Sequence, residues 1–576
     1  MLRRHPARVG HDAPDQEAPG REPVASGRSL AKGAEQPAPS GEQVAAAPVP
    51  AATRAAVVAW LARAYLTWLP PLIVVVGAAI RVREYSFRRS LWLDESLIAL
   101  NLVQRSYRGL LEPLDLRQAA PAGWLWAERA VIGLLGRTEY GLRLIPMLAG
   151  IGALLGVWWV ARRLLPDWLV PVALALAACS PFLLYYSNEA KQYETDATIG
   201  LGLLIASMEL LRDRPGWRRM LVWAGLGAVA VWCSHPAVLL LAGYAAALAV
   251  VHLLRRNWVT LAQLAGAAVV CGSSFLAVYA VSLGSVRDDP QLSEWWRDGF
   301  VPQPLEPSSA LGWLGRRSVE FVANPLGLAP PLAVAAVLAL GAAALLRSRP
   351  TLAMLLLAPL PVFVGAAAIQ AYPVRSRLLL VLVPTVLLVA AAAPDWSGGG
   401  LAGLSGRVAG LVLLGGLLLA PAADALRLLG DPTTVEELRP VMEQVKERSD
   451  PGERIWVYRG AGSPFAFYAP SVGLHADAGV VRRRSPVPCG RIRTVLRRAS
   501  MGSDRLWVVF GHHFSSWPPN ERAIFLSRMD LIGRQVDAVH APGAVAYRYD
   551  LTGPPADPTG ARLLPVPSTR NCYKIE

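Results

Sequence analysis

Long apolar runs are the feature that most constrains the fold of this sequence. Several reach the ~20 residues that a helix needs to cross a ~30 Å hydrocarbon core. Only 17% of the 576 residues are charged, below the roughly 25% of soluble domains. The fold class is therefore predicted to be a polytopic α-helical membrane protein. We expect about eleven spans, at 57–80, 141–162, 168–187, 196–212, 219–233, 236–254, 258–281, 328–346, 352–370, 378–394 and 407–429.

Arginines in the short loops indicate how these spans are oriented. They gather at 162–163, 212–219, 255–256 and 347–349, all on the side of the N-terminus. Cytoplasmic loops carry such an excess. The protein is therefore predicted to lie in the cytoplasmic (plasma) membrane with its N-terminus on the cytoplasmic side. An odd number of spans then places the C-terminal region outside. The net charge of +15 is explained by topology, so the lipid bilayer and not nucleic acid is the expected partner.

The composition divides the chain into successive parts. Residues 1–56 lack apolar periodicity and predict a disordered cytoplasmic tail. Residues 57–429 form the predicted transmembrane domain, with a first outer loop at 81–140. Within that loop the run 124–135 is apolar but short, so we interpret it as an interfacial helix and not as a span. Residues 430–553 mix helix and strand patterns and predict a small extracytoplasmic α/β domain.

The α/β prediction depends on a few short segments. A helical pattern covers 435–448, and β-rich runs lie at 454–458, 505–510 and 544–549. The Pro-rich stretch 554–576 is predicted to be a loose tail.

The first polar cluster is the acidic pair Asp94-Glu95, which lies in the first outer loop within an aromatic and leucine-rich setting. Adjacent side chains point in different directions, so one carboxylate can face a cavity while the other meets a basic residue. Burial raises the pKa of a carboxylate and suits it to act as a general base. The alternative is an interfacial pair that neutralises Arg88, Arg89 or Arg105.

The second cluster, at 185–196, joins two apolar runs. If it is helical from Tyr186, the spacing places Tyr186, Glu189, Tyr193 and Asp196 on one face, with Lys191 off it. So many ionisable groups beside hydrocarbon must pair or line a wet cavity. The alternative is interfacial anchoring by Tyr and Lys.

The third cluster contains Arg375 and Arg377, which the topology places outside, against the usual bias. Guanidinium groups carry a permanent charge and match the geometry of phosphate. Contact with anionic lipid headgroups is the alternative.

No cysteine or histidine spacing predicts a zinc site, and no cofactor is expected to be required. A divalent ion held by Asp94 with Glu189 is left open. Cys489 and Cys572 would form a disulfide only if the C-terminal region is extracytoplasmic.

These clusters, in this order, resemble the polytopic GT-C glycosyltransferases, in particular the family 39 or RgtABCD-like group related to protein O-mannosyltransferases and aminoarabinose transferases. The similarity is strongest over 57–210. It rests on Leu93-Asp94-Glu95, Gln118-Ala119-Ala120-Pro121-Ala122, Leu134-Leu135-Gly136, the segments 139–146 and 180–193, and Pro373-Val374-Arg375 with Pro384.

The resemblance implies inverting transfer of a hexose or pentose from a polyprenyl-phosphate carrier to an extracytoplasmic glycan, lipid or protein. It implies that Asp94 is the base, with Glu95 as its supporting partner. Lys191 and Arg375 or Arg377 would hold the lipid phosphate. Glu189, Tyr193, Tyr186 and Gln118 would line the substrate cavity. Two departures are Ala120-Pro121-Ala122-Gly123, where the family often has His-Pro-Pro-Leu, and Lys191, where arginine is common.

Two other functions are compatible with the sequence. A transporter or flippase of lipid-linked sugars would carry charges at the bilayer midplane. A non-catalytic envelope protein would bind polysaccharide through residues 430–550.

Overall fold

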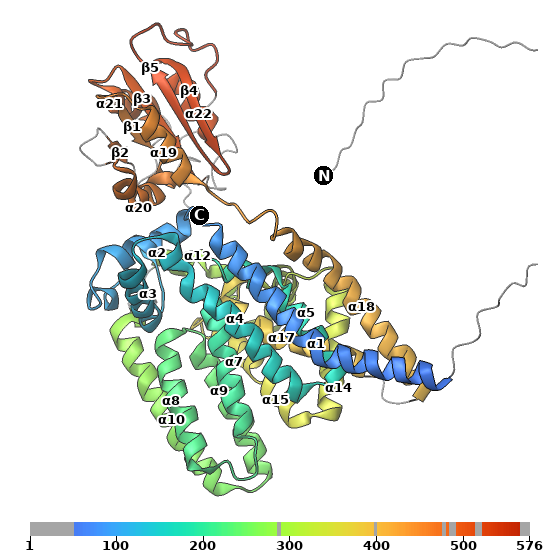
Figure 1. The fold of residues 1–576 in the computed structure, drawn as a ribbon. Helices are drawn as coiled ribbons and strands as arrows, with labels where there is room; N and C mark the ends of the chain where they lie inside the picture. Colours follow the sequence, from blue (N-terminus) through green and yellow to red (C-terminus); the bar gives the residue numbers. More distant parts are fainter. Residues whose placement is uncertain are drawn as a thin grey trace, which may run out of the picture. The chain divides into compact units, whose positions relative to one another are not determined.

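The computed structural model describes residues 51–284, 290–396, 400–474, 480–482, 491–512 and 521–564 (Figure 1). The α-helices up to residue 427 are α1 (Ala51–Ser86), α2 (Leu93–Gln104), α3 (Ala122–Leu135), α4 (Glu139–Leu164), α5 (Val170–Ala178), α6 (Pro181–Tyr186), α7 (Tyr193–Glu209), α8 (Gly216–Cys233), α9 (Ala237–Leu254), α10 (Trp258–Val278), α12 (Pro290–Trp295), α13 (Pro307–Phe321), α14 (Pro331–Ser348), α15 (Pro350–Leu357), α16 (Pro359–Ala368), α17 (Val383–Ala391) and α18 (Gly400–Arg427).

Eight helical stretches among the described residues are long and apolar enough to cross a membrane, at 63–86, 139–164, 237–254, 258–283, 331–348, 350–368, 376–395 and 403–427. The chain is therefore a multi-pass membrane protein. The three other predicted spans coincide with α5 and α6, with α7 and with α8, which are shorter or less apolar. The predicted span 168–187 is broken because α5 ends at Ala178 and a new helix starts at Pro181, where the proline ring prevents continuation.

The membrane helices pack around one large apolar core. Helix α10 lies along α8 and α9, and α4 lies along α5 and α7 (Figure 1). The backbone of α14 approaches that of α17 at Gly341, where an added Cβ would lie 1.9 Å from the carbonyl oxygen of Val389. Small residues allow this kind of backbone approach between membrane helices.

Several predicted boundaries differ from the structure. Helix α1 begins at Ala51 and not at Val57, so 51–56 are helical, whereas the rest of the predicted tail lies outside the described residues. The same helix continues to Ser86, which shortens the first outer loop. That loop contains α2 and, as predicted for the short apolar run, a 14-residue helix α3.

The C-terminal region contains a mixed five-stranded sheet in the order β2-β1-β3-β5-β4. The first three strands in that order are parallel, and β3, β5 and β4 are antiparallel. The strands predicted at 454–458, 505–510 and 544–549 are present as β1, β3 and β5, whereas β2 and β4 were not predicted. The elements are α19 (Leu438–Arg448), β1 (Arg454–Val457), α20 (Gly462–Val472), β2 (Val480–Arg482), α21 (Ile492–Ser500), β3 (Arg505–Phe510), α22 (Glu521–Met529), β4 (Arg534–Ala541) and β5 (Ala544–Asp550).

Side chains alternate between the two faces of a strand, and β3 is buried on both of its faces, whereas most of β4 is exposed or half-buried. Trp507 and Val509 of β3 face a cluster that includes residues of α19 and α20, whereas Leu506, Val508 and Phe510 face α21 and α22. The first cluster also contains apolar residues of α2 and α3. The first outer loop and one face of the sheet therefore share a single apolar core.

The described part of the predicted loose tail is attached to the sheet region. The amide of Ala556 donates to the carbonyl oxygen of Gly533, and the amide of Asp557 donates to that of Asp530. Residues 565–576, and with them Cys572 and the segment with Cys489, lie outside the described residues.

Candidate active site

The candidate site is built around the first turn of α2, which begins directly after the extended residue Trp92. This turn carries Asp94 and Glu95. Negative side chains are favoured here because the free N–H groups at a helix N-terminus give it a partial positive charge. The two acids point to different partners.

Asp94 lies between two cations from distant parts of the chain. Its Oδ1 is 3.1 Å from Nζ of Lys191, and its Oδ2 is 2.7 Å from Nη1 of Arg377. Lys191 also donates to Oε1 of Gln118 over 2.8 Å. The structure therefore brings together four of the residues selected from the sequence.

Electrostatics keep Asp94 ionised in this arrangement. Burial alone would raise its pKa, but the charges of Lys191 and Arg377 and their hydrogen bonds outweigh burial and lower the pKa to about 2. The Lys191 and Asp94 side chains are only 6% and 16% exposed, so solvent screens their attraction weakly. The carboxylate is thus a counter-ion that holds both cations in place.

Aromatic rings surround the Arg377 guanidinium. Its central carbon lies 5.3 Å from the ring centre of Tyr193 and 5.8 Å from that of Trp296. Tyr193 in turn meets Tyr186 edge to face, with ring centres 5.2 Å apart. Cations are attracted to aromatic faces at such distances. Trp296 was not among the predicted site residues, although its loop at 282–327 was expected to cap a cavity or to touch lipid.

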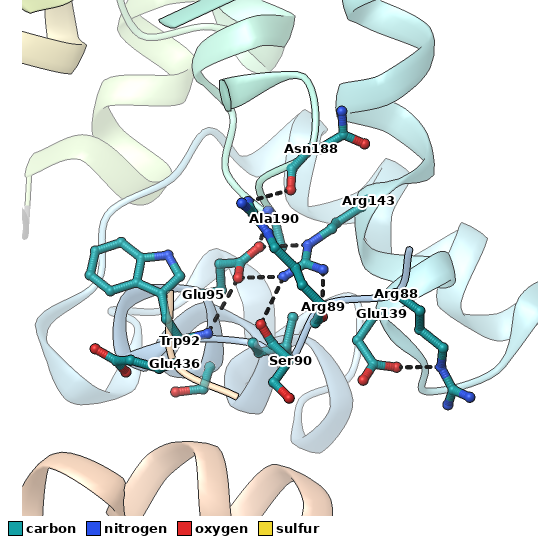
Figure 2. A network of polar contacts seen from close by, with 12 residues as sticks. Arg88, Arg89, Ser90, Trp92, Glu95, Glu139, Arg143, Asn188, Ala190 and Glu436 are labelled. Carbon is teal, nitrogen blue, oxygen red and sulfur yellow. Dashed lines mark hydrogen bonds and ion pairs between the residues drawn. The ribbon is translucent and has the colours of Figure 1, made fainter. Parts of the chain in front are cut away.

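Glu95 turns away from this group and forms a buried ion pair with Arg143 of α4 (Figure 2). Arg143 Nη2 is 2.6 Å and Nε 2.8 Å from the carboxylate oxygens. The amide of Ala190 donates to the same carboxylate over 2.8 Å. Arg143 also donates to the carbonyl oxygens of Arg89 and Ser90. This bidentate pair locks α2 to α4 and to the 188–190 turn, a role that the sequence did not assign to Arg143.

Glu189 lies in the turn between α6 and α7, as expected for a cluster that joins two apolar runs, and the helix considered from Tyr186 onward does not form. Helix α6 ends at Tyr186 and α7 starts at Tyr193, so the predicted face is divided, although Tyr186 and Tyr193 still touch. Glu189 is completely buried. Burial first, and then repulsion from Glu95 and Asp94, raise its pKa to about 7, although Arg89 and Arg377 oppose the shift.

Glu189 should therefore make stability depend on pH. Between its ordinary pKa of 4.5 and about 7, the folded state holds the proton more tightly than the unfolded state. The free energy of unfolding must then fall as pH rises through this window. We expect a lower thermal midpoint at pH 8 than at pH 5.5 in detergent, and a smaller difference for Glu189→Gln. The exposed-site variant Glu443→Gln should behave like wild type, and an unaltered pH difference in Glu189→Gln would contradict the assignment.

Arg375, also predicted to bind phosphate, does not join the Asp94 group. Its Nη1 donates to the carbonyl oxygen of Trp295 over 3.3 Å and lies 3.8 Å from Asp298, while its Nε lies 3.8 Å from Glu320. Of the two arginines, Arg377 is the one beside Asp94.

No group of three or more His, Cys, Asp or Glu side chains suited to a metal ion occurs in the described part of the chain. A divalent ion held by Asp94 and Glu189 does not fit this arrangement, because each Asp94 oxygen already faces a cationic nitrogen.

Comparison with known proteins gives distant structural similarity only. No protein-family model matches the chain, and no curated protein does. The chain is similar to apo ArnT from Cupriavidus metallidurans, with 15% identity, 86% of this chain and 98% of that chain covered, and a TM-score of 0.48. The chain is also similar to the same protein bound to undecaprenyl phosphate, with 15% identity, 83% of this chain and 97% of that chain covered, and a TM-score of 0.43. A third similar structure is the oligosaccharyltransferase AglB from Archaeoglobus fulgidus, in complex with an inhibitory peptide and a dolichol-phosphate. Here the identity is 11%, 83% of this chain and 74% of that chain are covered, and the TM-score is 0.42. At these identities and TM-scores, neither family membership nor activity follows from the likeness.

Proposed function

We propose that this protein is a membrane glycosyltransferase that moves a sugar from a polyprenyl-phosphate carrier to an extracytoplasmic acceptor with inversion. The observation that carries the proposal is the convergence of Lys191 and Arg377 on the two oxygens of Asp94. Two cations and a carboxylate are the groups that such a displacement needs. The motif order of the GT-C enzymes, which the sequence resembles, supports the same reaction.

In the proposed mechanism, the phosphate of the donor replaces Asp94 as the partner of Lys191 and Arg377. Loss of these two ion pairs raises the pKa of Asp94 from its low value, because the charges that depress it are then shared with phosphate. Asp94 becomes a stronger base at the moment when the donor is bound. The aromatic rings beside Arg377 keep its guanidinium in position.

The chemical step is a single displacement at the anomeric carbon. The acceptor hydroxyl gives its proton to Asp94, and its oxygen forms the new glycosidic bond. The bond from the anomeric carbon to the phosphate oxygen breaks, and the lipid phosphate leaves with the electron pair. Preplaced donors that stabilise such developing charge contribute ~3–4 kcal/mol each in comparable sites. Glu95, held by Arg143, positions α2 and does not take the proton.

The direct test is incubation of purified protein in lipid nanodiscs with radiolabelled polyprenyl-phosphate sugars, hexose and pentose in parallel. Label that moves from the lipid to an acceptor in cell-envelope extract supports the proposal, and the inverted configuration is checked by NMR of the product. If wild type transfers no label from any donor but moves intact lipid-linked sugar across liposomes, a transporter is the better assignment.

Arg377 and Arg375 provide a matched pair of variants for donor binding. Charge-assisted hydrogen bonds contribute ~1.5–3 kcal/mol, so Arg377→Ala should weaken binding of polyprenyl phosphate by about 10- to 100-fold. Arg375→Ala removes the same charge two residues away, outside the Asp94 group, and should change the Kd by less than about threefold. Isothermal titration in nanodiscs measures both. Equal losses in the two variants would remove Arg377 from the phosphate site.

A further inference from the structure

The segment before Asp94 is held by side chains that lie more than three hundred residues later in the chain. The amide of Ser90 donates to Oε2 of Glu437 over 3.0 Å, that of Leu91 donates to the Tyr468 hydroxyl over 2.7 Å, and that of Leu93 donates to Oε2 of Glu436 over 3.1 Å. The C-terminal region therefore supplies the acceptors for three of the four amides at 90–93.

The carbonyl side of the same segment is fixed from the membrane domain. Arg143 of α4 donates to the carbonyl oxygens of Arg89 and Ser90 over 2.7 and 3.2 Å. Residues 90–93 are thus clamped from two sides, with Arg143 on one and residues 436, 437 and 468 on the other. Figure 2 shows Ser90, Trp92 and Glu436 beside the Glu95–Arg143 pair.

Glu436 contacts both the N-terminus of α2 and His512. Leu93 is the first residue of α2, and its amide is one of those that a helix leaves without an internal partner. Glu436 caps that amide with one carboxylate oxygen, while the other oxygen lies 2.6 Å from Nδ1 of His512. The His512 ring lies 6.1 Å from that of Trp92. His512 therefore orients the carboxylate that fixes the residue next to Asp94.

We infer that Glu436 is a positioning residue for Asp94, oriented by His512, so that the C-terminal region takes part in setting the geometry of the transfer site. This inference rests on the proposed function for its effect on rate. It assigns no contact between Glu436 and substrate, because Glu436 acts through the backbone of Leu93. Misplacement of a reacting group by about 1 Å costs on the order of 100-fold in rate, so loss of the cap should lower kcat.

Two variants separate the cap from general structure. Glu436→Ala removes the acceptor of the Leu93 amide, whereas Glu436→Gln keeps a side-chain oxygen at the same place. We expect Glu436→Ala to lower kcat by about 10- to 100-fold with little change in KM for the donor. Glu436→Gln should restore most of the rate. Glu447→Ala, at an exposed site on α19, the helix that starts two residues after Glu436, is the matched control and should resemble wild type.

Hydrogen exchange measures the clamp without any donor, and so independently of the proposed function. In the peptide covering 88–96, Glu436→Ala should exchange about tenfold faster at the Leu93 amide, while Glu436→Gln and Glu447→Ala should not. If wild type transfers no sugar, the exchange result still tests the clamp.

Exchange and kcat of Glu436→Ala within twofold of wild type would overturn the inference, as would a Glu436→Gln variant impaired as strongly as Glu436→Ala. Should Glu436→Ala fail to fold, His512→Ala replaces it, and this variant should change both quantities in the same direction but by less; no change in either would again overturn the inference.

Discussion

Replacing Asp94 by Asn is expected to lower sugar transfer by about 100- to 10,000-fold, the usual contribution of a general base. Asparagine keeps the size of the side chain but cannot take the proton of the acceptor hydroxyl. The substitution also removes the negative charge that pairs with Lys191 and Arg377, whose nitrogens lie 3.1 and 2.7 Å from the Asp94 oxygens. The two cations then lose their competitor for phosphate, so the donor should bind at least as tightly as to wild type. The expected combination is low kcat with an unchanged or lower KM.

The measurement is single-turnover transfer of labelled sugar in nanodiscs, with donor affinity titrated separately. Asp115→Asn is the matched control, because Asp115 lies in the same outer loop, is 66% exposed and pairs with Arg105. An exposed pair contributes little, so this variant should transfer sugar within about twofold of wild type. Asp94→Asn protein that transfers sugar at the wild-type rate would exclude Asp94 as the base.

Replacing Arg143 by Met is expected to destabilise the protein by about 3–5 kcal/mol. The Arg143 and Glu95 side chains are 4% and 0% exposed. Loss of the cation leaves a carboxylate buried without its bidentate partner, and two carbonyl oxygens lose their donor as well. Such a loss is a large part of a typical net stability of ~5–15 kcal/mol. The double variant Glu95→Gln with Arg143→Met should recover part of it, because no uncompensated charge remains.

Unfolding in SDS at fixed lipid-to-detergent ratio provides the measurement. Arg427→Met is the control at an exposed ion pair. Nη1 of Arg427 lies 2.9 Å from Oδ1 of Asp424, and the two side chains are 76% and 63% exposed. Its effect should lie within ~1 kcal/mol. Equal losses for Arg143→Met and Arg427→Met would show that burial of the Glu95 pair is not what stabilises α2.

Much of the site could be predicted from the sequence because topology restricts where polar clusters can lie. Apolar runs and loop arginines predicted Asp94, Gln118, Lys191 and Arg377 on one side of the membrane, and these four side chains form one group in the structure. The choice between Arg375 and Arg377 could not be made in this way. Arg375 is extended, but Ser376 has a φ of 46°, so the backbone turns between them and the two side chains reach different partners.

Other features depended on long-range packing, which local patterns do not encode. Strand β2 has only three residues, and the burial pattern of β4 follows no clean alternation, so neither gave a periodic signal. The break at Pro181 was missed because the apolar run continues through it, whereas the break between Tyr186 and Tyr193 lies where the predicted spans 168–187 and 196–212 are separated. Arg143 was visible only as part of a motif, because its partner lies 48 positions earlier in the chain.

The shared apolar core has a consequence for biosynthesis. Leu91, Ile98 and Leu102 of the first outer loop belong to the same cluster as Leu438 and Val441. A ribosome makes the first group long before the second. During translation, the apolar side chains of this loop must therefore remain without these partners until the last quarter of the chain has been made. A chain that stops between residues 427 and 438 keeps all the described membrane helices, but Leu91, Ile98 and Leu102 then lack their partners on α19.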